Sequence, residues 1–144
     1  MTGKVVALWL KRFKRGPMDR VLFVEAIEGR GLSGNANQGG KRQVTIIDEA
    51  RWSDAQREVG VDVDPSARRA NVMLRGLDLE GTRGKMLRVG PVLIRIYNET
   101  RPCEQMDEAQ PGLRAALGVA WRGGAYGEVV EGGVIREGDS AAWE

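Results

Sequence analysis

The single cysteine of this 144-residue chain, Cys103, is the side chain best suited to covalent or metal chemistry. It follows Arg101 and Pro102, and polar residues continue on its other side. A guanidinium two residues away favours the thiolate, the form of cysteine that attacks electrophiles, carries sulfur or binds a soft metal. The alternative is a structural cysteine packed in the core. The polar neighbours on both sides favour a reactive position.

Three short segments could bind an anion close to such a thiolate. They are Gly39-Gly40-Lys41-Arg42-Gln43, Arg68-Arg69-Ala70-Asn71 and Trp121-Arg122-Gly123-Gly124. Arginine outnumbers lysine 17 to 5, and a planar guanidinium binds phosphate with two hydrogen bonds, whereas lysine offers a point charge. Each segment alone is typical of an exposed turn, so an anion site requires that they converge on Cys103.

Composition excludes several other kinds of site. The chain has no histidine, which rules out a Ser-His-Asp triad and a zinc site of the HExxH type. One cysteine allows neither an intramolecular disulfide nor a cysteine-cluster metal site. The formal net charge is only +2. Although residues 11–15 form a short basic run, we therefore expect no nucleic-acid partner.

The length and hydropathy pattern favour one globular domain over residues 1–144. No apolar run approaches the roughly 20 residues of a membrane span, so we expect no membrane partner. A lone thiol is typical of a reducing compartment, and we expect a cytoplasmic protein.

Short strands must position these residues, because twenty glycines spread along the chain indicate many tight turns. The predicted strands are 4–11, 20–27, 42–48, 71–75, 86–97 with a break at Gly90-Pro91, 126–130, 134–136 and 140–143. The last three are expected to form a hairpin or meander that turns at Gly132-Gly133. Two helices are expected, at 48–59 with Asp48 as N-cap and at 111–117. The predicted fold is mainly β: a closed or nearly closed barrel with about two helices.

An ordered series of short motifs resembles the MOSC domain, the module named after the C-terminal part of molybdenum cofactor sulfurases. The motifs are Gly40–Thr45, Arg69-Ala70-Asn71, Gly76–Leu79, Leu87–Gly90, Arg101-Pro102-Cys103, Gly123-Gly124, Gly132–Ile135 and Gly138-Asp139. Each motif alone is loose, but their order and spacing are fairly specific over residues 25–141. Membership of this family implies a β-rich, barrel-like fold.

The resemblance implies a role for Cys103 as sulfur carrier or as a thiolate ligand of molybdenum. It also implies that molybdenum-bound molybdopterin is held by cations and an amide beside that cysteine. The matching residues are Arg42, Arg69, Asn71 and Arg101, with Lys41 and Arg122 as further candidates. The protein would then be a component of a molybdenum-dependent oxidoreductase or of a sulfurtransferase. Its partner would be a cysteine desulfurase, a molybdoenzyme or a redox protein.

The sequence also departs from the family pattern. Many members have Gly-Asp followed by Arg-His where this chain reads Gly34-Asn35-Ala36-Asn37. No room exists for the desulfurase domain of the larger sulfurases, so we expect no pyridoxal phosphate on this chain. The additional N-terminal barrel of amidoxime-reducing relatives is not expected either. These departures leave open an alternative: a non-catalytic small barrel that acts as an interaction module, with Cys103 as a structural residue.

Overall fold

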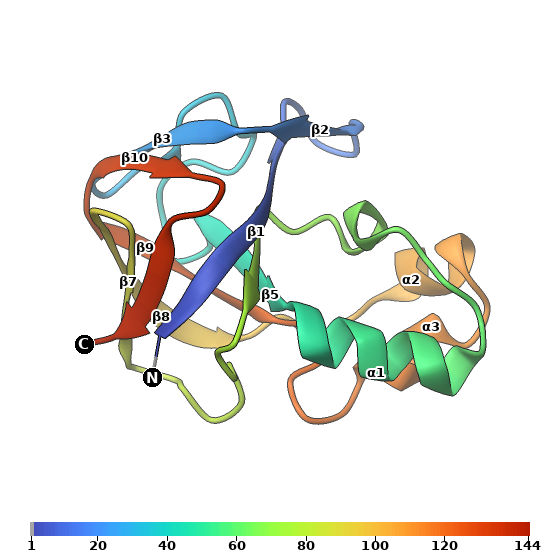
Figure 1. The fold of residues 1–144 in the computed structure, drawn as a ribbon. Coiled ribbons are helices and arrows are strands. Elements are labelled where there is room, and N and C mark those ends of the chain that lie inside the picture. Colours follow the sequence, from blue (N-terminus) through green and yellow to red (C-terminus); the bar gives the residue numbers. More distant parts are fainter. Residues whose placement is uncertain (1) are drawn as a thin grey trace.

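The computed structural model describes residues 2–144, which form a closed barrel of seven strands with helices beside it (Figure 1). The barrel strands are β1 (Thr2–Lys11), β5 (Val44–Asp48), β6 (Val72–Arg75), β7 (Met86–Val89), β8 (Val92–Glu99), β9 (Ala125–Glu131) and β11 (Ser140–Trp143). They pair in the order β11-β7-β8-β9-β5-β6-β1, and β1 pairs again with β11 to close the circle. The predicted barrel is confirmed.

One pair of barrel strands, β5 and β6, is parallel, and the other neighbours are antiparallel. A parallel pair needs a long crossover between its strands. Helix α1 (Glu49–Val59) and the 3-10 helix η1 (Pro65–Arg68) provide that crossover. Helix α1 begins after Asp48, as predicted, and ends at Gly60, whose φ of 81° is readily adopted by glycine.

Aliphatic side chains fill the barrel, because the strand residues that face inward are apolar. Leu8, Ile46, Leu74, Leu87 and Ile94 are completely buried there. Burial of each such side chain contributes about 1.5–3 kcal/mol to the free energy of unfolding. The interior is therefore a packed core, and a ligand must bind at its rim.

A smaller sheet and an extra edge strand lie on one side of the barrel. Strand β2 (Met18–Val21) extends the barrel sheet beside β1, while β3 (Phe23–Ile27) pairs with β4 (Gly31–Leu32) and β10 (Gly133–Arg136). The predicted single strand over 20–27 is thus divided at exposed Leu22 between two sheets.

The predicted C-terminal hairpin or meander is wrong. Strand β10 pairs with β3, and β11 pairs with β7 and β1, so consecutive strands β9, β10 and β11 are not neighbours. Gly133 has a φ of 155°, outside the range that hairpin turns of the common two-residue types require. The chain changes sheet at this glycine instead of folding back.

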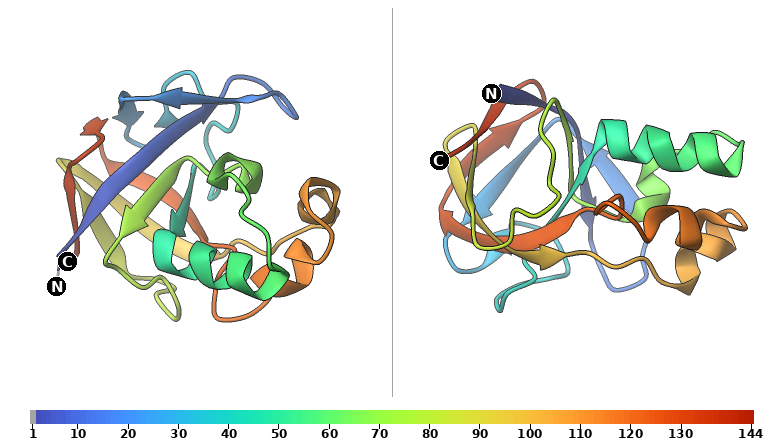
Figure 2. Two further views of the ribbon diagram at one scale, coloured as in Figure 1. Left: turned by 45° about the vertical axis from the view of Figure 1, so that its right-hand side comes forward. Right: turned by 90° about the horizontal axis from the view of Figure 1, so that it is seen from below.

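Two further helices, α2 (Glu104–Ala109) and α3 (Leu113–Leu117), lie with α1 on the side of the barrel away from the chain termini (Figures 1 and 2). They share a second core made by Trp52, Met106, Leu113 and Leu117. The predicted second helix corresponds to α3, whereas α2, directly after Cys103, was not predicted. No helix within residues 2–144 is long and apolar enough to cross a membrane.

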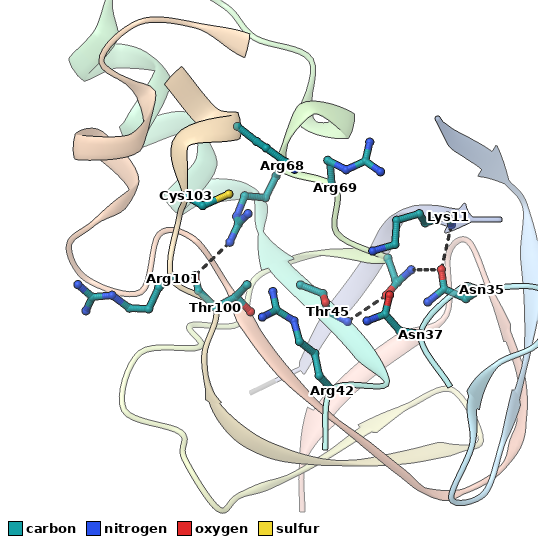
Figure 3. Close-up of a pocket in the computed structure, with 12 residues that line it drawn as sticks. Lys11, Asn35, Asn37, Arg42, Thr45, Arg68, Arg69, Thr100, Arg101 and Cys103 are labelled. Carbon is teal, nitrogen blue, oxygen red and sulfur yellow. Dashed lines mark hydrogen bonds between the residues drawn. The ribbon is translucent and has the colours of Figure 1, made fainter. Parts of the chain in front are cut away.

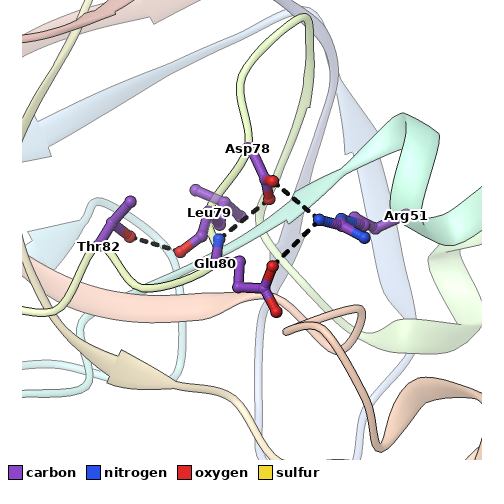
Figure 4. Close-up of polar contacts among 5 residues, drawn as sticks. All are labelled: Arg51, Asp78, Leu79, Glu80 and Thr82. Carbon is purple, nitrogen blue, oxygen red and sulfur yellow. Dashed lines mark hydrogen bonds and ion pairs between the residues drawn. The ribbon is translucent and has the colours of Figure 1, made fainter.

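The Gly76–Leu79 motif stabilises the fold and lies outside the hollow that contains Cys103. Leu77 and Leu79 are buried in the barrel core. Asp78 accepts a hydrogen bond from Arg51 of α1 at 2.8 Å, and Glu80 accepts another from the same guanidinium at 3.3 Å (Figure 4). This contact connects the crossover helix to the loop after β6.

Candidate functional site

A polar cavity of about 220 Å³ lies where the rim of the barrel meets the helices. Its walls come from the end of β1, the 33–42 loop, the starts of β5 and β6, the end of η1, and the segment that follows β8. The lining residues are Lys11, Asn35, Asn37, Arg42, Thr45, Arg68, Arg69, Asn71, Thr100, Arg101, Cys103 and Gln105. Figure 3 shows Cys103, Arg68 and Arg101 on one side and Lys11, Asn35 and Asn37 on the other.

The cavity is strongly positive, because five of its lining residues are cations and none is an acid. Four of the cations have no salt bridge within residues 2–144. The fifth, Arg101, is 3.6 Å from Glu99 and is largely exposed. Unpaired cations around one cavity favour an anionic ligand.

Arg68 is the most buried of these cations, with 6% of its surface exposed. Its Nε donates to the Gly123 carbonyl oxygen at 2.8 Å, and its Nη2 donates to the Thr100 carbonyl oxygen at 3.1 Å. Burial, with a smaller contribution from the positive charge of Arg42, lowers the pKa of Arg68 to about 10. The guanidinium therefore remains charged at neutral pH although no carboxylate compensates it. Such a buried charge is costly unless a bound anion offsets it.

Asn71 connects three parts of the cavity wall. Its Oδ1 accepts from the Thr45 amide at 3.1 Å, and its Nδ2 donates to the Trp9 carbonyl oxygen and to Asn35 Oδ1, both at 3.2 Å. Asn35 Oδ1 also accepts from the Lys11 amide at 2.9 Å. Both amide hydrogens of Asn71 are thus used to position the wall. A free donor at this end of the cavity is the Nδ2 group of Asn35, for which no acceptor is found in residues 2–144.

Cys103 lies at the start of α2 and is partly exposed. The segment before it is held by Gly123-Gly124, because the Thr100 amide donates to the Gly124 carbonyl oxygen at 2.8 Å. A Cβ atom at Gly123 would overlap the Thr100 carbonyl oxygen, and one at Gly124 would overlap the Ile46 carbonyl oxygen. This pair of glycines therefore allows the segment that carries Cys103 to lie close to the barrel.

Thr100 has a buried hydroxyl that faces the same cavity. The residue is 1% exposed, and its Oγ1 has no hydrogen-bond partner in the described chain. Buried hydroxyls are normally hydrogen-bonded, because an unmet hydrogen bond costs free energy. The cavity thus contains both an uncompensated buried cation and an unpartnered hydroxyl close to the thiol.

The structure brings together five of the seven residues named from the sequence: Arg42, Arg69, Asn71, Arg101 and Cys103 all line the cavity. The other two lie outside it. Lys41 is in a neighbouring hollow, with its Nζ 5.5 Å from the centre of the Tyr97 ring. The Nη1 of Arg122 donates to Glu58 at 3.0 Å and to the Ala116 carbonyl oxygen at 2.9 Å, so that this side chain connects helices.

Six lining residues were not candidates from the sequence: Lys11, Asn35, Asn37, Thr45, Thr100 and Gln105. Lys11 ends the first predicted strand, so it could have been included by extending that strand's role to its last residue. Arg68 lies in the predicted anion-binding segment Arg68–Asn71, although only Arg69 and Asn71 of that segment were assigned to the cofactor. The burial of Arg68 could not be predicted, since it depends on carbonyl groups 32 and 55 residues away.

Comparisons with known proteins agree with this architecture. The MOSC domain model matches residues 33–142. The fold is similar to that of the YUAD protein from Bacillus subtilis, with a TM-score of 0.81 and 20% identity over 98% of this chain and 94% of that one. YiiM from Geobacillus stearothermophilus gives a TM-score of 0.76 and 16% identity over 99% and 75% of the two chains. YiiM from Escherichia coli gives 0.70 and 16% over 98% and 69%.

No curated protein sequence matches the chain. At these identities the structural likeness shows the fold, whereas the family match covers most of the sequence. The chain therefore belongs to the MOSC domain family, which is associated with functions of the molybdenum cofactor.

Proposed function

We propose that the cavity beside Cys103 binds the molybdenum cofactor and that the Cys103 sulfur is its contact with the metal. The observation that carries this proposal is a partly exposed thiol in a cavity with five cations and no carboxylate. A thiolate is soft enough for molybdenum, and arginine is suited to the phosphate of molybdopterin.

The lining residues fit such a ligand. Arg68 offers a buried positive charge without an acidic partner, and the Thr100 hydroxyl offers an unpaired polar atom beside it. The Asn35 Nδ2 group supplies a hydrogen-bond donor on the opposite wall, suited to a polar atom at the edge of the pterin ring. Arg42 and Arg69 line the cavity from the segments before β5 and β6 and would hold the phosphate, while Asn71 connects the start of β5 to β1. When bound, the cofactor supplies redox chemistry at its metal.

A second candidate function is that of a sulfur carrier, which the partial exposure of Cys103 favours. In that role the Cys103 thiolate attacks the outer sulfur of a persulfide on a cysteine desulfurase. A new S–S bond forms at Cys103, the S–S bond on the desulfurase breaks, and the desulfurase cysteine leaves as a thiolate.

A non-catalytic interaction module with a structural cysteine is less well supported. A structural thiol belongs in the core, whereas Cys103 is partly exposed and lines the cavity. The proposed partners are therefore those that the chemistry requires: a desulfurase, a molybdoenzyme or a redox protein.

The test compares wild type with Cys103→Ser, which keeps the size of the side chain but replaces the soft sulfur. Both are purified from a host that makes the cofactor, and molybdenum and oxidised, fluorescent pterin are quantified. We expect stoichiometric molybdenum and pterin in wild type, and loss of molybdenum from a Cys103→Ser protein whose thermal unfolding is unchanged. Absence of both from wild type, or equal molybdenum in the variant, would overturn the cofactor proposal.

The sulfur-carrier function needs a separate measurement. Incubation with a cysteine desulfurase and cysteine should add the mass of one sulfur atom to wild type and none to Cys103→Ala. Equal labelling of the two proteins would exclude Cys103 as the carrier.

A further inference from the structure

A second hollow adjoins the Cys103 cavity and is also basic. It lies between the loop after β1 and the 36–42 loop, and it shares Lys11, Asn37 and Arg42 with the first cavity. Lys14 and Lys41 complete its cationic wall. No acidic residue lines it. The positive surface therefore extends from the Cys103 cavity to Lys14 and Lys41.

The loop that forms this hollow is held in place by two glutamine side chains. Gln38 Nε2 donates to the carbonyl oxygens of Leu32 and Asn35 at 2.8 and 2.9 Å. Buried Gln43 donates to the Gly40 carbonyl oxygen at 2.8 Å, and its Oε1 accepts from the Val129 amide at 3.0 Å. The wall is thus organised before any ligand arrives.

Backbone amides add to the donors of this hollow. Gly39 and Gly40 have φ values of 71° and 68°, and a Cβ atom at either would meet nothing within 4 Å. These glycines are required by the backbone conformation and not by close packing. For the amides of Gly40, Lys41 and Arg42, no acceptor is found in residues 2–144. Consecutive free amides after left-handed residues are typical of anion-binding loops.

The neighbouring charges show that this positive potential is not neutralised. Arg12, in the loop after β1, is paired with Asp19 at 3.1 Å. Lys14 and Lys41, in contrast, have no salt bridge in the part of the chain described. The pKa of Lys11, which lines both hollows, is lowered by burial and by the positive charges of Arg69, Arg42 and Lys14. Positive charges from both hollows therefore lower the pKa of the same lysine, and no acidic residue lines either hollow.

We propose that the Lys14–Lys41 hollow is a second anion subsite, which receives a phosphate group on a ligand whose other end lies at Cys103. This inference rests on the proposed function only for the identity of that other end. The phosphate belongs either to a nucleotide extension of the cofactor or to a separate phosphorylated substrate. In both cases the recognition is the same: two lysine ammonium groups and a row of backbone amides around one phosphate.

The first experiment is an NMR titration of metal-free, ¹⁵N-labelled protein with inorganic phosphate. The amide resonances of Gly40, Lys41 and Arg42 are expected to shift in wild type and in Cys103→Ser. They should stay in place in the double variant Lys14→Gln/Lys41→Gln, while resonances of the 100–103 segment still shift. The matched control is Arg83→Gln/Arg114→Gln, which removes two exposed cations outside both hollows and should behave as wild type.

Two results would overturn the subsite: no shift at residues 40–42 in wild type, or equal shifts in the Lys14→Gln/Lys41→Gln protein. Because this titration uses no metal, its result is independent of molybdenum content, so failure of the subsite and failure of the proposed function are distinguishable. The source of the phosphate follows from mild acid hydrolysis of protein purified with its cofactor. Release of one nucleoside monophosphate per pterin identifies a nucleotide extension, and pterin without nucleotide assigns the subsite to a separate substrate.

Discussion

The guanidinium of Arg68 donates from Nη2 to the carbonyl oxygen of Thr100 at 3.1 Å, three residues before Cys103. The same side chain reaches the Gly123 carbonyl oxygen through Nε. Arg68 thus connects the crossover between β5 and β6 to the segment before Cys103 and to the turn that contains Gly123. Arg68 therefore positions the cavity wall in addition to supplying its charge.

Arg68→Met should destabilise the protein and weaken anion binding. Two carbonyl oxygens lose a charged donor, so we expect the free energy of unfolding in urea to fall by about 1–3 kcal/mol. Phosphate should raise the melting temperature of Arg68→Met less than that of wild type. Arg68→Lys keeps the charge without the planar fork and should retain part of the phosphate effect. An Arg68→Met protein with wild-type stability and phosphate response would contradict this role.

Gly124→Ala should disturb the support of the Cys103 segment. Gly124 has a φ of 97°, and an added Cβ would overlap the Ile46 carbonyl oxygen. We expect a loss of at least about 2 kcal/mol in urea unfolding. The control is Gly81→Ala, at a φ of 71° with nothing within 4 Å of the added Cβ, which should cost about 1 kcal/mol. Equal costs would show that close packing at Gly124 is unimportant.

Asp48→Asn should stabilise the protein at neutral pH. Burial raises the pKa of Asp48; the neighbouring amides of Ala50 and Arg51 partly oppose this shift, although no capping hydrogen bond of normal geometry forms. A carboxyl whose pKa is raised by folding lowers stability above that pKa and recovers it as the pH falls. The stability gained by Asp48→Asn should therefore be greatest near neutral pH and disappear below the ordinary aspartate pKa. A constant difference between pH 3 and pH 7 in urea unfolding would contradict this.

Arg42→Gln and Arg122→Gln should have different effects, although both residues were candidates from the sequence. Arg42 lines the cavity, so its replacement should weaken phosphate binding by about ten-fold, the usual order for one charged hydrogen bond. Arg122 holds Glu58 and the Ala116 carbonyl oxygen, so its replacement should leave phosphate affinity unchanged and lower stability by about 1 kcal/mol. Calorimetric titration and urea unfolding separate the two effects. Equal phosphate affinities of the two variants would contradict the assignment.

The barrel could be predicted from the sequence because its strands carry apolar and β-branched residues between glycine-rich turns. The range 42–48, for example, gives β5 and the residues after Asp48 give α1. Pairing partners could not be predicted in the same way. The parallel contact of β5 with β6 and the exchange of β10 into the smaller sheet depend on residues far apart in the chain.

The candidate site was predicted in part, through short motifs that combine cations with glycine or asparagine. The segment Arg68–Asn71 was found in this way, but the burial of Arg68 depends on carbonyl groups far away in the chain and could not be predicted. Lys41 and Arg42 are adjacent in sequence, but Arg42 lies over the Tyr126 ring and Lys41 over the Tyr97 ring. Only the folded loop distinguishes which of the two reaches the Cys103 cavity.

The contact between β1 and β11 also determines when the protein can fold. Residues Thr2, Gly3 and Lys4 pair with Ala142, Ala141 and Ser140, so the barrel closes only after residue 142 has left the ribosome. Until then the start of β1 remains an unprotected edge, and contacts between such distant residues form slowly. The closed barrel that supports the Cys103 cavity therefore forms only after the domain has been synthesised, and the edge of β1 stays exposed during that interval.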